Sequence, residues 1–502
     1  MTRFLFLIVF VCCAAALWGQ TSGLLVSDDR YQQIPLLPTY SGVKYTEIPA
    51  RVSLKKYCPV PGNQGKSGAC VGWSVGYGAL TIHRAILNNI TDQAVITKNA
   101  HSAAFLYNQI RKNKTDCSEG AYIEDGLVLL KTMGDCLEES FVFDKNDCAE
   151  QPNAQQIAEA SQYRVQDFAS VYAIDEDAKS KISKTCKILA TQTPIIVGIG
   201  ITKSFFEVLP GADTWNPETN EATAGYHAMV VVGYNSVEKY FDLLNSFGAS
   251  WGKNGFIRMY FDDFERLCRY AYVVVPPTHI ATNKPAIVPA NSVQTAPNIP
   301  TESVVLSGEF VFRQPAGYVS NENGDELMYF EEIATTLQNT GAGGLYQTTK
   351  AQFKVGDVFQ LVAREIPRGR YVYVFSQSQD GTLNQHFPRK KQAIASAGFV
   401  LEKTVEIVIP SEESLLQLPV PGKDYLCIVY SHAPIGQYEQ RLQSIEQEQG
   451  GEFPEKVHTA FADVLIEPQN IQFSDKKMAF SAISHPEKGK IATIMMLVVE
   501  AE

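Results

Sequence analysis

Residues 61–74 of the chain read Pro61-Gly-Asn-Gln-Gly-Lys-Ser-Gly-Ala-Cys-Val-Gly-Trp-Ser74. A glycine-rich loop carrying Gln64 leads into Cys70, and the apolar run 71–87 that follows predicts a buried helix. A thiol at a helix N-terminus lies at the positive end of the helix dipole, which favours the thiolate. The thiolate is the reactive form, so Cys70 is a candidate nucleophile.

Two later blocks carry groups that would support a thiolate. Gly225-Tyr-His-Ala-Met-Val-Val-Val-Gly-Tyr234 places His227 at the start of a predicted strand, and Asn245 opens Asn245-Ser-Phe-Gly-Ala-Ser-Trp-Gly252. Taken singly, each residue has an ordinary structural reading: a buried thiol, a core histidine or a turn asparagine. Their joint occurrence with Gln64 favours catalysis.

These blocks resemble the papain-like cysteine peptidases, family C1, over roughly residues 45–277. The order of Cys, His and Asn matches, although His227 and Asn245 lie somewhat beyond the roughly 130 to 150 residues usual after the cysteine. The resemblance implies an α+β fold with a helical and a β subdomain and a cleft between them. It also implies thiol peptidase chemistry by Cys70, His227 and Asn245, with Gln64 binding the oxyanion and no cofactor or metal.

Three positions depart from the family pattern. Ser67 replaces a cysteine that usually forms a disulfide, Val71 replaces an aromatic residue, and Phe247 replaces the tryptophan that shields the His and Asn pair. None removes a catalytic group, so the departures bear on rate and stability more than on reaction type.

Between the blocks, the sequence predicts a helix within 120–134 that ends at Gly134, and a short buried strand over 194–201. The stretch 203–224 contains Phe205, Phe206, Leu209 and Trp215, and we expect it to border the cleft.

The N-terminus predicts export. Arg3 precedes the apolar run 4–16, which is too short for a comfortable membrane span and is typical of a signal peptide over 1–19. We therefore expect a secreted, periplasmic or surface-associated protein, with residues 20–44 as an extension too short for a folded inhibitory domain. No other run is long and apolar enough to span a bilayer.

Export permits disulfides among the ten cysteines of the chain. Cys12 and Cys13 fall in the predicted signal, Cys70 is the candidate nucleophile, and Cys427 lies in an apolar run typical of a buried thiol. Up to three bridges remain open, with connectivity that spacing does not decide, among Cys58, Cys117, Cys136, Cys148, Cys186 and Cys268.

A change in composition indicates a second domain after the first. The Pro-, Ala- and Thr-rich stretch 278–303 predicts an extended linker, and 304–502 predicts a mainly β accessory domain with one surface helix over 438–447. Strands are expected over 353–362, over 371–375, after Pro421-Gly422 and over 491–499. This part resembles an uncharacterised β-rich bacterial domain of unknown function, which implies no activity and leaves His386 and His432 as structural residues.

The sequence therefore predicts a secreted, bacterial, papain-like peptidase that acts on peptide or protein substrates. Its net charge of −11 argues against nucleic acid as a partner. The accessory domain is expected to bind a cell-envelope or protein partner. Two alternatives stay open: a catalytically silent scaffold with the same fold, and a cell-wall amidase or acyl transferase that uses the same triad.

Overall fold

The structure is a computed structural model of the chain. It describes these residues: 22–37, 48–113, 116–145, 147–275, 303–320, 326–339, 341, 343–349, 353–364, 366–367, 370–388, 390–391, 394–395, 406–410 and 415–502. The predicted signal peptide, and the predicted linker apart from its last residue, lie outside this set.

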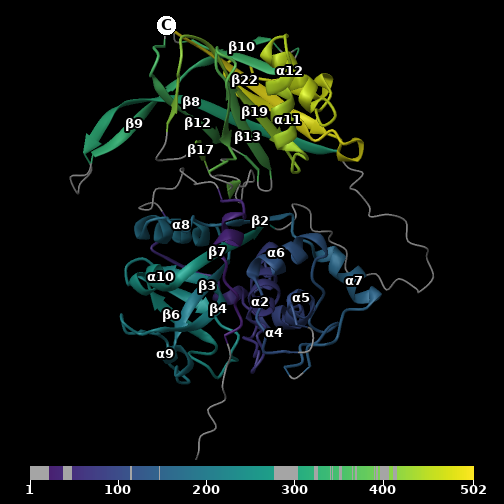
Figure 1. Cartoon of the computed structure of the whole chain (residues 1–502), viewed down its shortest axis with the longest axis vertical. Helices are drawn as coiled ribbons and strands as arrows, with labels where there is room; N and C mark the ends of the chain where they lie inside the picture. Colours follow the sequence, from purple (N-terminus) through teal and green to yellow (C-terminus); the bar gives the residue numbers. More distant parts are fainter. Residues whose placement is uncertain are drawn as a thin grey trace, which may run out of the picture.

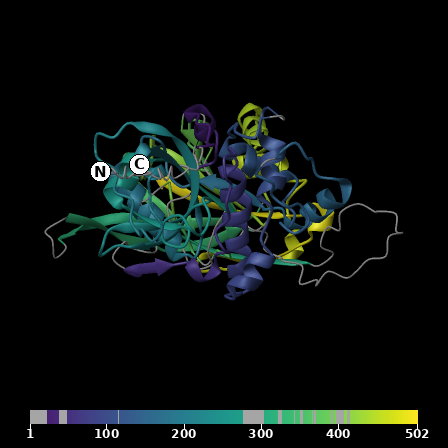
Figure 2. The ribbon, with the colours of Figure 1, turned by 90° about the horizontal axis from the view of Figure 1, so that it is seen from below.

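The N-terminal body has a helical half and a sheet half, which lie side by side in both views (Figures 1 and 2). The central helix of the helical half is continuous from Cys70 to Leu87, as the apolar run predicts, with a π-helical middle. The helical half comprises η2 (Lys55–Tyr57), α2 (Cys70–Gly72), η3 (Trp73–Leu80), α3 (Thr81–Leu87), α4 (Gln93–Lys98), α5 (Ala103–Ile110), α6 (Ile123–Thr132), α7 (Ala154–Ala160) and η4 (Ser161–Tyr163).

Glycines let neighbouring elements pack closely on the central helix. A Cβ atom at Gly72 would lie 2.1 Å from the carbonyl oxygen of Ala103 in α5. A Cβ atom at Gly78 would lie 2.8 Å from the side chain of Val230 in the sheet half. The helix is therefore clamped between the two halves, and its first residue, Cys70, is fully buried at their boundary.

The sheet half is a seven-stranded sheet in the order β2-β7-β3-β4-β5-β6, with β1 paired to β4. Its pairings are antiparallel. The strands are β1 (Arg51–Ser53), β2 (Asp167–Ser170), β3 (Ile195–Thr202), β4 (Thr223–Asn235), β5 (Tyr240–Leu244), β6 (Phe256–Tyr260) and β7 (Cys268–Val275), and the helices are α8 (Ala178–Ala190), α9 (Lys203–Phe206) and α10 (Phe261–Leu267). The buried strand predicted over 194–201 is β3.

The stretch preceding this domain packs into it. The short helix α1 (Asp28–Gln32) buries Tyr31 completely, with its ring stacked on Tyr270 at 4.7 Å and its hydroxyl donating to the Tyr172 carbonyl at 2.6 Å. The Leu37 amide donates to the Ser170 carbonyl at 2.7 Å. Residues treated as an extension in the sequence thus contribute to the domain core.

The C-terminal body is mainly β (Figure 1). Its described residues form two large sheets, a separate two-stranded sheet and two α-helices. One large sheet has the order β10-β11-β22-β19-β13-β14, and the other has β17-β12-β8-β21-β20 with β18 and β9 attached. The elements are β8 (Val304–Ser320), β9 (Glu326–Ile333), β10 (Thr335–Asn339), β11 (Gly344–Thr348), β12 (Val358–Arg364), β13 (Tyr371–Gln377), β14 (Leu383–Phe387), β15 (Lys390–Lys391), β16 (Ile394–Ala395), β17 (Ile407–Ile409), β18 (Leu416–Gln417), β19 (Gly422–Ser431), α11 (Tyr438–Gln447), α12 (Phe453–Phe461), η5 (Pro468–Asn470), β20 (Ile471–Phe473), β21 (Met478–Ser484), η6 (Pro486–Lys488) and β22 (Ala492–Ala501).

One predicted strand is shorter than the sequence suggests. Alternation over 353–362 predicted a single strand, whereas β12 begins at Val358. Gly356 has φ +94°, and the Asp357 carboxylate accepts from the Lys354 amide at 3.0 Å, so these residues form a turn. Among the described residues, no helix is long and apolar enough to cross a membrane.

Candidate active site

Cys70 opens the central helix at the boundary of the two halves. Its thiol lies near the backbone groups of Ala228 and Gly23, so the sulfur lies beside the residue that follows His227. Burial raises the pKa of the Cys70 thiol to about 11, although these nearby backbone groups act in the opposite direction. In this arrangement the thiol keeps its proton at neutral pH.

His227 and Asn245 form a hydrogen-bonded pair in the sheet half. His227 lies on β4 opposite Ile199 of β3, and Asn245 directly follows β5. The His227 Nε2 and Asn245 Oδ1 atoms are 2.7 Å apart. The Nδ1 atom has no hydrogen-bond partner among the described residues, and both side chains are buried.

Burial also changes the proton affinity of the histidine. It lowers the pKa of His227 to about 4, against the opposing effect of the hydrogen bond to Asn245. Fully buried, the imidazole is neutral at pH 7, as is the thiol of Cys70. The described state is therefore one in which a thiolate and imidazolium pair is not formed.

An aromatic cluster covers the His and Asn pair. The Phe247 ring lies 4.8 Å from the His227 ring, and Phe205 lies 5.7 Å from it. Trp251 packs on Phe205 at 5.0 Å. The cover therefore combines Phe247, where the family has tryptophan, with Trp251 and Phe205, so the histidine hydrogen bond is shielded from water.

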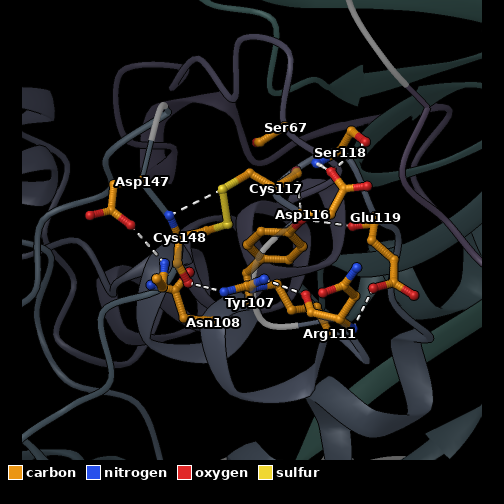
Figure 3. Close-up of a disulfide and its surroundings, with 12 residues drawn as sticks. Ser67, Tyr107, Asn108, Arg111, Asp116, Cys117, Ser118, Glu119, Asp147 and Cys148 are labelled. Carbon is orange, nitrogen blue, oxygen red and sulfur yellow. Dashed lines mark hydrogen bonds between the residues drawn. A yellow bond between two sulfur atoms is a disulfide. The ribbon is translucent and has the colours of Figure 1, made fainter.

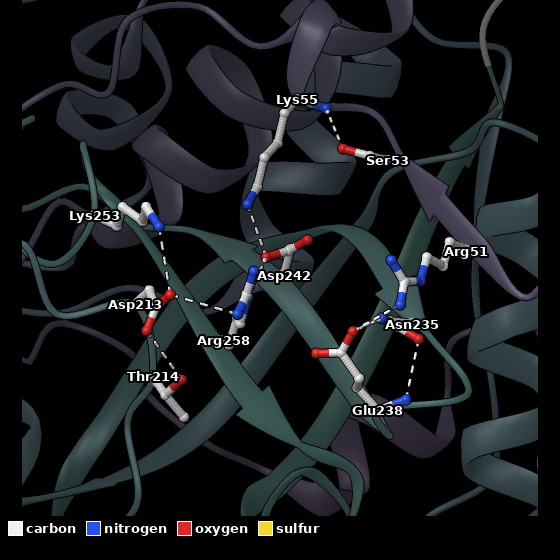
Figure 4. Close-up of polar contacts among 10 residues, drawn as sticks. All are labelled: Arg51, Ser53, Lys55, Asp213, Thr214, Asn235, Glu238, Asp242, Lys253 and Arg258. Atoms are coloured by element: carbon white, nitrogen blue, oxygen red, sulfur yellow. Dashed lines mark hydrogen bonds and ion pairs between the residues drawn. The ribbon is translucent and has the colours of Figure 1, made fainter.

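The stretch 203–224, expected to border the cleft, supplies part of this cover. Trp215 packs on Phe205 at 4.8 Å, whereas Leu209 is exposed. Asp213 lies 3.4 Å from the charged groups of Lys253 and Arg258, which fastens the loop to β6 (Figure 4). Nearby, Asp242 of β5 pairs with Lys55 of η2 at 2.8 Å and so joins the two halves.

Gln64 is buried where the loop before Cys70 meets the sheet half. Its Nε2 donates to the Ser67 carbonyl at 2.8 Å, and its Oε1 accepts from the Ser246 hydroxyl at 2.7 Å. The backbone N–H of Gln64 also donates to the Ser246 carbonyl at 2.9 Å. The structure thus brings Gln64 next to the residue that follows Asn245.

Residues 22–26 run between the two halves and across Cys70, a feature that the sequence reasoning missed. The Ala121 amide donates to the Gly23 carbonyl at 2.9 Å, and the Leu25 amide donates to the Ala121 carbonyl at 3.0 Å. On the other side, the Leu24 amide donates to the Tyr226 carbonyl at 3.2 Å. A Cβ atom at Gly23 would lie only 2.1 Å from the Gly68 carbonyl oxygen.

A weak signal for this segment does exist in the sequence. Ser27 caps α1 by accepting from the Arg30 amide, and Asp28 and Asp29 occupy the first turn. Such a cap followed by acidic residues is a helix start. The apolar Leu24-Leu25-Val26 just before it could have suggested a strand that needs a partner.

A disulfide joins Cys117 to Cys148 beside the site (Figure 3). The Cys117 carbonyl accepts from the Gly68 amide at 2.7 Å and from the Tyr107 hydroxyl, also at 2.7 Å. The disulfide thus holds in place the segment around Cys117, which bonds to Gly68 and lies near residues 23–25. The other described cysteines are buried free thiols: Cys58, Cys70, Cys136, Cys186, Cys268 and Cys427.

Part of the chain is similar to known proteins. Residues 58–277 match the family model described as "Papain family cysteine protease". An uncharacterized peptidase C1-like protein, L477, of Acanthamoeba polyphaga mimivirus is 28% identical over 163 residues, which is 32% of this chain and 52% of that protein. The chain thus spans about half the length of this curated relative.

Solved structures of cysteine proteases match about half of the chain. Xylellain, a cysteine protease from Xylella fastidiosa, matches with a TM-score of 0.44 and 20% identity over 51% of this chain and 97% of its own. Digestive procathepsin L2 proteinase from the Tenebrio molitor larval midgut matches with a TM-score of 0.41 and 22% identity over 51% and 78%. The family match ends at residue 277, before the β-rich body. Residues 58–277 of this chain are therefore similar to the papain family of cysteine proteases.

Proposed function

We propose that this chain hydrolyses peptide bonds through Cys70, His227 and Asn245. The observation that carries the proposal is the 2.7 Å contact of His227 Nε2 with Asn245 Oδ1, next to a thiol that lies against the backbone of Ala228. Asn245 holds the imidazole so that the other ring nitrogen is left for the thiol. The match of residues 58–277 to the papain family of cysteine proteases supports the same assignment.

The chemistry follows from these positions. Cys70 and His227 form the thiolate and imidazolium pair, and the thiolate attacks the substrate carbonyl carbon. The Cys70 backbone N–H and the Gln64 amide stabilise the oxyanion. His227 then gives its proton to the leaving amine, and water hydrolyses the thioester to release the acid and the free thiol.

Residues 22–26 must leave before a substrate can reach Cys70. Gly23 lies against the thiol and Gly68, and Leu24 bonds to Tyr226, the residue before His227. Removing this cover would expose the thiol and the imidazole to water. Exposure lowers the pKa of a thiol and raises that of an imidazole, so the ion pair becomes accessible.

We further propose that the protein is exported and that the C-terminal body serves in targeting or binding. Arg3 and the apolar run 4–16 support a signal peptide. The disulfide between Cys117 and Cys148 supports an oxidising compartment. The β-rich body lies beyond the papain-family match, which leaves it free for a separate binding role.

Hydrolysis of a fluorogenic peptide library tests the proposed reaction. We expect the protein that lacks residues 1–27 to cleave peptides of the library. The same protein with Cys70→Ser should cleave none. Cys427→Ala is the matched control, because Cys427 is also a buried thiol but lies on β19. A folded protein that cleaves no peptide would favour the silent scaffold, and one that cleaves only cell-wall amides would favour the amidase.

A further inference from the structure

The C-terminal body contains a cavity of about 330 Å³ between its two sheets. Part of its wall is apolar and buried, as is usual inside a β-sandwich. This apolar wall is formed by Phe359, Leu416, Leu418, Leu426 and Val499. This wall offers an apolar surface to a hydrocarbon chain.

The opposite part of the wall is polar: Ser378 and Asp424 are buried, Ser376 is half-buried and Asn384 is exposed. Ser376 of β13 lies opposite Asn384 of β14 on one side and Leu426 of β19 on the other. Ser378 and Asp424 lie two residues along from Ser376 and Leu426, so they share a face of the sheet with them. Buried polar residues are the informative exception to the rule of apolar cores.

Asp424 is the unusual member of this wall. It is only 7% exposed, and its Oδ2 has no hydrogen-bond partner in the described part of the chain. Burial raises the pKa of Asp424, while a hydrogen bond from Ser378 lowers it. No described Lys or Arg forms an ion pair with it. A buried carboxylate oxygen without a donor is destabilising.

We propose that this cavity binds a primary ammonium group on a short hydrocarbon stem. The ammonium donates to Asp424, and its remaining N–H groups reach the oxygens of Ser376, Ser378 and Asn384. The stem lies on the apolar wall formed by Leu426, Val499 and their neighbours. An ammonium carries three donors on a compact centre, which suits a small cavity better than the wide guanidinium plane.

Two sources carry this chemistry: a free alkylamine and the lysine side chain of a protein. Either would give the β-rich body a binding role that is independent of the peptidase reaction. The proposal does not rest on the catalytic assignment, and the two fail separately.

Ligand-observed NMR titration of the full chain tests the proposal. The probes are n-butylamine for a free amine and Nα-acetyl-lysine methylamide for a protein side chain. Nα-acetyl-norleucine methylamide has the same stem without the charge, so it reports apolar binding alone. Competition between the two amines shows whether they share one site.

Two charge-matched variants locate the binding site. Asp424→Asn removes the carboxylate but keeps the shape. Glu500→Gln removes the same charge on the neighbouring strand, where Glu500 lies opposite Lys423 and is exposed. Circular dichroism and thermal melts confirm that both variants fold, and we expect no loss of stability from removing a poorly paired buried charge.

We expect at least one of the amines to bind the full chain and Glu500→Gln equally, and the norleucine compound not to bind. In Asp424→Asn the affinity should fall by about 10-fold or more, as expected for loss of a charged hydrogen bond. Binding of butylamine alone points to a free amine, and binding of the lysine compound points to a protein partner. The proposal is overturned if neither amine binds at millimolar concentration, or if Asp424→Asn binds as tightly as the full chain.

Discussion

At the scale of the residue, Gln64 connects the two halves of the proposed site. Its side chain bonds to Ser67 in the helical half and to Ser246 in the sheet half. Because both bonds fix the amide, Gln64 is held in place before any substrate arrives. Fixed donors stabilise a developing oxyanion without a cost of reorganisation.

Replacing Gln64 by alanine should therefore slow peptide hydrolysis. It should leave the reactivity of the Cys70 thiol unchanged. Loss of one oxyanion donor lowers kcat by about 100- to 1,000-fold. Steady-state hydrolysis of a fluorogenic peptide gives kcat, and alkylation of Cys70 by iodoacetamide gives the thiol reactivity. Asn63→Ala, at an exposed neighbour, is the control. Unchanged hydrolysis in Gln64→Ala would rule out the assigned role.

Two carboxyl groups in the helical half, the buried Asp135 and the half-buried Glu138, make stability depend on pH. Burial raises the pKa of Asp135 well above its usual range, and the charges of Glu138 and Glu159 raise it further. Burial also raises the pKa of Glu138 to about 7. Neither Asp135 oxygen has a hydrogen-bond partner among the described residues. The folded protein thus holds protons that the unfolded chain releases near pH 4.

The free energy of unfolding should consequently fall as pH rises from about 4 to 7, by up to about 1.4 kcal/mol per pH unit for each group. The sign follows because the folded state binds more protons than the unfolded state in this range. Urea unfolding at a series of pH values measures the slope. Glu138→Gln should flatten it, and Glu139→Gln, at the exposed neighbour, should not. Equal slopes in both variants would show that Glu138 is not the titrating group.

The sequence allowed candidate site residues to be chosen where the proposed reaction requires a particular residue type. Cys70, His227, Asn245 and Gln64 could be chosen from local context, and the structure brings all of them to one boundary. Trp251 could not be assigned to the aromatic cover, because its ring reaches Phe205 only through the fold. The buried Asp135 was equally hidden, since burial of one carboxyl group depends on packing from several elements.

At the scale of the element, the segment 22–26 decides whether the site is accessible. Its backbone bonds to Ala121 in the helical half and to Tyr226 in the sheet half. Helix α1 anchors it through Tyr31, which is fully buried. Because α1 is part of the domain core, residues 22–26 stay in place until the chain is cut or the segment is displaced.

Gly23→Ala should displace this segment. The added methyl would lie 2.1 Å from the Gly68 carbonyl oxygen, closer than any real contact, so the backbone must move. We expect Cys70 to react with an epoxysuccinyl inhibitor at least about 10-fold faster, the effect of roughly 1.4 kcal/mol on the covering equilibrium. Gly436→Ala, at a glycine with nothing nearby, is the control. Equal labelling rates in all proteins would show that the segment does not limit access.

Long elements with a clear period were predictable, and the covering segment was not. Strand β3, helix α11 and the central helix follow from apolar pattern and length. Residues 22–26 have no period of their own, because their hydrogen bonds go to Ala121 and Tyr226, far along the chain. The turn at Gly356 was missed because alternation continues through it, and only the positive φ reveals the break.

At the scale of the whole molecule, the two bodies touch through polar contacts. The Tyr371 hydroxyl of β13 donates to Asp167 Oδ2 of β2 at 3.2 Å, and Asp167 also pairs with Lys131 at 2.7 Å. The sequence predicted two bodies from the change in composition, but it could not predict this contact. Contacts between bodies depend on surfaces that no local pattern specifies.

With residues 1–27 removed, a chain that ends near Pro285 should still hydrolyse short peptides, because Cys70, His227 and Asn245 all precede the boundary. Its kcat/KM should lie within about two-fold of that of the protein that lacks only residues 1–27. Loss of the Tyr371 bond should lower stability by about 1 kcal/mol. The comparison uses a fluorogenic peptide and thermal melts, with Tyr371→Phe in the full chain as the control for this one bond. Loss of turnover on truncation would mean that the β-rich body completes the peptidase.

Cys70 should become a reactive thiolate once residues 22–26 leave it. Intact-mass spectrometry of Gly23→Ala after treatment with an epoxysuccinyl thiol-peptidase inhibitor measures this. We expect a single adduct, mapped to Cys70 by peptide digestion, and its absence when Cys70→Ser is added. A folded Gly23→Ala protein that gains no adduct, or gains it on another cysteine, would show that residues 22–26 do not hold back a reactive Cys70.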